Sequence, residues 1–207
     1  SFSVFKKMNS LAISDSFLFL VATYFALQSK IPIAFRLGAA VLGAAAILGV
    51  LRFSELLPLP QLHSFFSALG ASSAFLLIGV SVIWPTRLVS VKAKYASILL
   101  IVSAALGLVM VTGFGFAIFG QLIAFLSVLL IVVSALRNRR IYSLFGALVL
   151  ASGFILFVMK YSVPGYLQPG DFLHIFTAIG LLTFGQIHSA YAHLITPSGI
   201  FPKEQTP

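Results

Sequence analysis

Residues 115–136 read GFAIFGQLIAFLSVLLIVVSAL and contain no charged side chain. A helix needs about 20 such residues to cross the hydrocarbon core of a bilayer. Lipid offers the backbone no hydrogen-bond partners, so spanning segments must be helices or a closed barrel. Apolar runs that are unbroken rather than alternating favour helices. This stretch therefore predicts a transmembrane helix.

Comparable runs occur along the whole chain. The predicted spans are residues 8–28, 32–51, 61–84, 95–113, 115–136, 141–160 and 171–194. Of the 207 residues, 60% are hydrophobic and 8% are charged, too few charges to cover a water-soluble surface. The first run lacks a cleavage pattern, so we expect a retained helix. The sequence predicts an all-α fold, a polytopic seven-transmembrane helix bundle that forms a single domain over 1–207.

The net charge of +9 is distributed in short basic groups between the apolar runs. Because these groups form no continuous stripe, they argue against a nucleic-acid partner and instead indicate topology. The N-terminal side holds Lys6, Lys7, Arg52 and Lys160, and the opposite side holds Lys30, Arg36, Arg87, Lys92, Lys94, Arg137, Arg139, Arg140 and Lys203. We therefore predict an extracytoplasmic N-terminus and a cytoplasmic C-terminus.

Two segments resemble each other and indicate an internal repeat. Residues 62–65 read LHSF after Pro60, and residues 173–176 read LHIF after Pro169. If the likeness is real, the first three spans repeat as the last three around a linker helix, a 3+1+3 parallel repeat of the kind that some transporters use. Chance similarity between two apolar helices is the alternative.

The most informative polar residues gather on the predicted outer side. Asp15 lies in the first span, Glu55 precedes the third, and Asp171 opens the seventh. His63 and His174 lie near the starts of the third and seventh spans. An ionisable group within a membrane is costly, so it normally faces a partner or a wet cavity. We predict that these five side chains share one pocket.

Each of these residues also has a purely structural interpretation. Asp171 follows Pro169 and Gly170 and could cap its helix. Glu55 could pair with Arg52 in a solvated loop. The histidines could face lipid headgroups. Asp15 is explained least well by a loop or a cap.

Imidazoles and carboxylates are suitable ligands for zinc, whose bound water becomes nucleophilic near neutral pH. We predict a zinc site formed by His63, His174 and Glu55, with Asp15 and Asp171 as catalytic residues. The chain resembles the CREST superfamily, the seven-helix alkaline ceramidases and adiponectin receptors, in its seven-span layout and in these residue types. The resemblance implies a metal-dependent hydrolase of a lipid amide or ester, with membrane lipids as its partners.

Two other classes of function remain open. Protonatable Asp and His residues in a cavity also suit a proton-coupled small-solute transporter. An aromatic-rich bundle could instead be an accessory subunit that binds other membrane subunits. The chain has no cysteine, which excludes disulfides and thiolate chemistry.

Overall fold

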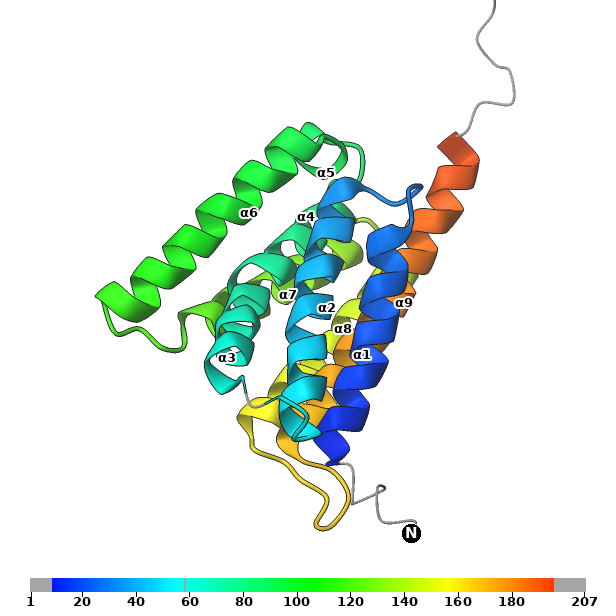
Figure 1. The fold of residues 1–207 in the computed structure, drawn as a ribbon. Helices are drawn as coiled ribbons and strands as arrows, with labels where there is room; N and C mark the ends of the chain where they lie inside the picture. Colours follow the sequence, from blue (N-terminus) through cyan, green and yellow to red (C-terminus); the bar gives the residue numbers. More distant parts are fainter. Residues whose placement is uncertain (1–8, 58, 196–207) are drawn as a thin grey trace, which may run out of the picture.

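The computed structural model describes residues 9–57 and 59–195, and for residues 190–195 it describes the backbone only. Seven of its helices are long and apolar enough to cross a membrane. This confirms the predicted all-α, seven-span bundle, and the chain is an integral membrane protein (Figure 1).

The helices follow the predicted spans closely. In chain order they are α1 (Ser10–Leu27), α2 (Ile33–Phe53), α3 (Pro60–Leu69), the π-helical turn η1 (Gly70–Ala74), α4 (Phe75–Ile83), the short α5 (Leu88–Val91), α6 (Ala93–Leu108), the π-helical turn η2 (Val109–Gly113), α7 (Phe119–Arg137), α8 (Ile141–Val158) and α9 (Pro169–Ile195). The third span therefore comprises α3, η1 and α4, and the fourth comprises α6 and η2.

The ends of α7 and α8 show how the sequence stops a helix without glycine. Arg139 and Lys160 have positive φ values of 54° and 53°. In each case the next residue donates its N–H to a carbonyl in the last helical turn, from Arg140 to Ala135 and from Tyr161 to Leu156. These are Schellman motifs, which satisfy carbonyls that would otherwise lack a partner.

Six of the spans form a closed ring, and α6 lies outside it. Helix α1 packs between α2 and α9, and the ring continues through α8, α7 and α4 back to α2. Figure 1 shows α6 standing apart from the other helices along much of its length. In an 18-residue stretch of the α6–η2 span, only 17% of the residues are buried, compared with 50% in the corresponding stretch of α2. One side of the ring therefore faces a loosely attached helix.

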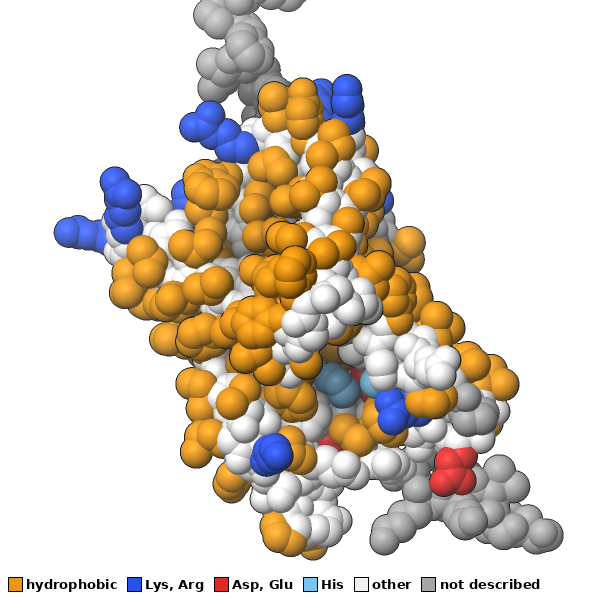
Figure 2. Space-filling model, turned by 90° about the vertical axis from the view of Figure 1, so that its left-hand side faces the viewer, with side chains coloured by type: hydrophobic (Ala, Val, Ile, Leu, Met, Phe, Trp, Pro, Cys, Tyr) orange, Lys and Arg blue, Asp and Glu red, His pale blue; other side chains and the backbone are white. Residues whose placement is uncertain are grey.

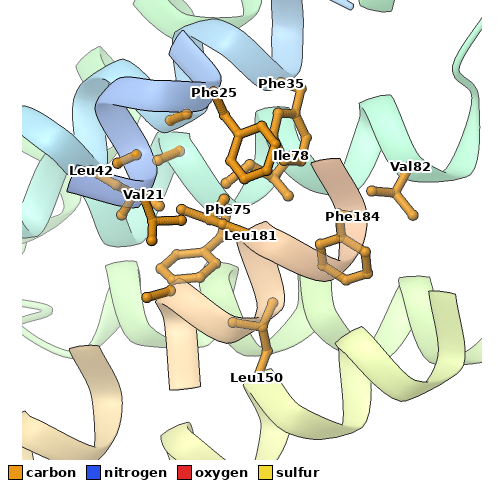
Figure 3. Packing of buried hydrophobic residues seen from close by; sticks show 14 of the residues in the cluster. Val21, Phe25, Phe35, Leu42, Phe75, Ile78, Val82, Leu150, Leu181 and Phe184 are labelled. Atoms are coloured by element: carbon orange, nitrogen blue, oxygen red, sulfur yellow. The ribbon is translucent and has the colours of Figure 1, made fainter. Parts of the chain in front are cut away.

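The core of the ring consists of aromatic and branched side chains that pack against small residues (Figure 3). Phe35 of α2 and Phe184 of α9 are fully buried. A Cβ on Gly146 of α8 would lie 2.7 Å from the Phe184 ring, so this contact requires glycine. Small residues that admit large partners are how helices gain packing in lipid, where no hydrophobic drive acts between them.

The outer surface is largely apolar, as a lipid-facing surface should be. Ile101, Leu130 and Phe145 are each at least half exposed. Figure 2 shows hydrophobic side chains over most of one face, with more Lys and Arg toward one end than the other. Of the residues used to predict sidedness, Lys6, Lys7 and Lys203 lie outside the described residues.

We expect Phe184→Ala to lower the free energy of unfolding by about 2 kcal/mol, because its packing contacts are lost. This is less than the ~3–5 kcal/mol typical of soluble cores, since lipid is nearly as apolar as the protein interior. Thermal unfolding in detergent micelles measures the effect. Phe145→Ala, which truncates a lipid-exposed ring on α8, is the matched control and should leave the midpoint unchanged. Equal midpoints for the two variants would contradict this account of the core.

Candidate functional site

The predicted site residues lie at one end of the bundle because of the chain's up-and-down path. The starts of α1, α3 and α9 and the end of α2 meet at this end (Figure 1). Asp15, Arg52, His63 and His174 all line a single cavity there. The structure thus brings together residues that are far apart in the sequence.

Asp15 and His174 form the central contact of the site. Asp15 Oδ1 lies 3.1 Å from His174 Nδ1 and joins α1 to α9. The Asp15 side chain is 2% exposed and the His174 side chain 18%. The other carboxylate oxygen of Asp15, Oδ2, has no hydrogen-bond partner among the described residues. A Cβ on Gly49 of α2 would collide with this carboxylate, so glycine makes room for it.

Asp171 does not line the cavity, and it contacts the Asp15–His174 pair through Ser14. Its Oδ1 accepts a hydrogen bond from Ser14 Oγ at 2.7 Å. Its Oδ2 accepts from the backbone N–H of Gln168, also at 2.7 Å. The second bond is one half of a capping box in the first turn of α9, so Asp171 caps this helix from its third residue rather than from the N-cap position considered from the sequence. Asp171 is fully buried and positions α9 and Ser14.

The hydrogen-bond network assigns the tautomer of His174. Ser14 Oγ donates to Asp171 and lies 3.3 Å from His174 Nδ1, where it can only accept. Asp15 also accepts at Nδ1 when it is ionised. With Asp15 ionised, Nδ1 therefore carries the hydrogen, and Nε2 has a lone pair. Because the ring lines the cavity, Nε2 is the atom available to a ligand.

A second pair, Arg52 with His63, lines the same cavity. Arg52 Nη1 lies 3.1 Å from His63 Nδ1. A guanidinium only donates, so His63 Nδ1 accepts and its Nε2 carries the hydrogen. That Nε2 lies 3.4 Å from Ser67 Oγ. The guanidinium also lies 5.2 Å from the Phe53 ring, within range of a cation–π interaction.

Glu55 lies apart from these pairs. It is exposed in the turn after α2, with a φ of 61°, and it does not line the cavity. Among the described residues, Arg52 contacts His63 and forms no ion pair with Glu55. The loop pair considered from the sequence is therefore absent from the described part of the chain.

The described side chains do not match the donor set of a zinc site. In residues 9–57 and 59–189, no group of three His, Asp or Glu side chains is arranged to share one metal ion. The Nδ1 atom of His174 is bonded to Asp15, and that of His63 to Arg52. The zinc site with His63, His174 and Glu55 stays a prediction.

The cavity itself is large and mostly apolar. Its volume is about 1160 Å³, above the 300–1,000 Å³ common for small-molecule sites. Leu42, Phe75 and Leu108 are among its apolar walls, which extend to α6, η2 and α7. Figure 2 shows His side chains inside a hollow on a largely hydrophobic face, with a basic side chain beside it. A large, mostly apolar lining with a few polar and charged groups suits an amphipathic ligand.

Comparisons with family models, with curated proteins and with solved structures found no match to this chain. The resemblance to the CREST superfamily therefore stays a prediction.

Sequence reasoning found Asp15, His63 and His174 because each is an ionisable residue within or next to an apolar run. It missed the role of Arg52, which resembled a loop residue. It did not place Gly49 opposite Asp15 and it missed Gln168, because the importance of each depends on which side chain lies opposite. The sequence contains no signal for such contacts.

We expect Gly49→Ala to destabilise the protein, since the new methyl group displaces the Asp15 carboxylate and breaks its bond to His174. The loss should be about 1–3 kcal/mol, typical of overpacking, and thermal unfolding in micelles measures it. Gly43→Ala on the same helix is the control, because its Cβ would meet Ala22 at an ordinary 3.5 Å.

A double variant separates this collision from a general effect on α2. In the Asp15→Ala background the carboxylate is gone, so Gly49→Ala should cost at least about 1 kcal/mol less than in the wild type. If the losses of stability in the two single variants add up to the loss in the double variant, the Asp15 carboxylate is not what Gly49 accommodates.

Proposed function

We propose that the protein hydrolyses an ester or amide bond in a membrane lipid. The observation that supports this most is the buried Asp15–His174 pair at the polar end of a long apolar cavity. The cavity would hold the hydrocarbon part of the lipid and bring its carbonyl group to His174. The seven-span layout shared with CREST hydrolases is consistent with this proposal.

In this proposal His174 acts as a general base. Its Nε2 takes a proton from water while the water oxygen attacks the carbonyl carbon of the lipid. Asp15 accepts a hydrogen bond from the Nδ1–H group of His174. This bond fixes the orientation of the imidazole ring and stabilises the imidazolium that forms. The tetrahedral intermediate then breaks its C–O or C–N bond, and His174 returns the proton to the leaving alcohol or amine. The products are a fatty acid and that alcohol or amine.

Asp171 and Ser14 have positioning roles in this proposal. Together they fix the first turn of α9 against α1, which sets the orientation of the His174 ring. If the His174 ring were misplaced, the rate of the reaction would fall steeply, because proton transfer requires a near-ideal geometry.

We expect Asp15→Asn to lower turnover by at least about 100-fold while the fold stays intact, because an amide fills the same space but does not stabilise an imidazolium. The assay is release of fatty acid from ester and amide lipids by the purified protein in micelles. His188→Gln is the control, since His188 lies far along α9 and does not line this cavity. Unchanged turnover in Asp15→Asn would remove Asp15 from the mechanism.

The same assay addresses the two alternative classes. Failure to release fatty acid, together with pH-driven solute uptake into proteoliposomes, would favour a transporter. Stable co-purification with other membrane subunits would favour an accessory role. Metal content measured on the same preparation tests the predicted zinc.

We further propose that the site faces the extracytoplasmic side, as the distribution of Lys and Arg predicts. The turn before α9 would then lie outside the cell, and the turn between α7 and α8 inside.

The absence of cysteine makes this orientation directly testable. Tyr166→Cys places one thiol in an exposed position before α9, and Asn138→Cys places one in the exposed turn after α7. In intact cells, a membrane-impermeant maleimide should label the first variant and spare the second until the cells are lysed. The opposite pattern would reverse the assignment.

A further inference from the structure

The wall of the cavity formed by α2 and α3 differs in kind from the wall formed by α1 and α9. The α1–α9 wall carries Asp15, whose Oδ1 contacts His174 and whose Oδ2 is buried. Arg52, Ser64 and Ser67 on α2 and α3 present donors to the same cavity. The cationic donor of the cavity thus lies on the α2–α3 wall, which we call the donating wall.

The positive charge on the donating wall has no neutralising partner in the part of the chain that is described. Arg52 is partly buried, and no carboxylate of residues 9–57 or 59–195 lies within ion-pair distance of its guanidinium. One Nη1–H is bonded to His63, which leaves the remaining N–H groups of the guanidinium for another acceptor. A guanidinium in an apolar cavity is expected to bind an anion.

The neighbouring hydroxyl groups extend this donor set. His63 Nε2–H points toward Ser67 Oγ at 3.4 Å, so the Ser67 hydroxyl hydrogen is free to point elsewhere. Ser64 lies on the same wall. A guanidinium with two hydroxyls matches a phosphate group, because the three acceptor oxygens of a phosphate can be contacted by more donors at once than the two oxygens of a carboxylate.

We propose that the cavity binds a phosphate-bearing lipid, with the phosphate on Arg52 and Ser67 and the acyl chains along the apolar walls. This inference builds on the proposed function by naming the class of substrate. The phosphate would lie on the α2–α3 wall, and the carbonyl group would lie between it and His174. Arg52 would then determine which lipids bind, without taking part in proton transfer.

The test compares two lipids with identical acyl chains, phosphatidic acid and diacylglycerol. Native mass spectrometry of the purified protein in micelles measures how much of each lipid stays bound. We expect the wild type to bind phosphatidic acid at least about tenfold more tightly than diacylglycerol. Arg52→Gln should remove this preference and leave diacylglycerol binding unchanged.

Two further variants make the outcome specific. Arg137→Gln removes an exposed charge at the far end of α7 and should keep the preference. Asp15→Asn should also keep it, so the proposed phosphate site can succeed even if hydrolysis fails. Loss of turnover in Asp15→Asn without any lipid preference in the wild type would support hydrolysis and overturn the phosphate site.

Two results would contradict the assignment. Retention of the preference in Arg52→Gln would place the phosphate elsewhere. Equally tight, Arg52-dependent binding of a free fatty acid would show that Arg52 recognises a carboxylate rather than a phosphate.

Discussion

Carboxylates that lie within a lipid-solvated bundle need hydrogen-bond partners, and the contact between α1 and α9 provides them. Ser14 and Asp15 are adjacent on α1, and they bond to Asp171 and His174 on α9. These bonds join the first and last spans of the chain, so they close the ring of helices. Gln168 adds to this junction, because its side chain donates to Asn9, the N-cap of α1.

The same junction determines which chemistry is available. Because Asp15 and Ser14 both contact Nδ1 of His174, the nitrogen that remains for a ligand is on the opposite side of the ring, at Nε2. A general base oriented by a carboxylate is a common solution in hydrolases. In the proposed hydrolysis, the position of His174 beside a mostly apolar cavity is what favours a lipid over a soluble substrate.

The cavity is lined both by helices of the ring and by the α6–η2 span, which lies outside the ring. Helix α6 touches the ring near the small pair Gly107 and Ser72, where a Cβ on Gly107 would lie 2.8 Å from Ser72 Oγ. Both residues line the cavity, as do Leu108 and Val111 farther along the α6–η2 span. The π-helical turn that contains Ser72 interrupts the third span at this point, and such turns are frequent at functional sites.

The sequence alone determined the spans, since a helix of about 20 apolar residues is the simplest way to cross lipid with every backbone group satisfied. It also drew attention to Asp15, because placing a carboxylate within an apolar transmembrane run costs free energy. Only the tertiary structure decided that Asp15 meets His174, that Arg52 meets His63 and that Glu55 faces away. Those pairings depend on how helices rotate and approach one another, which is decided by glycines such as Gly49 and by packing across the bundle rather than by any local pattern.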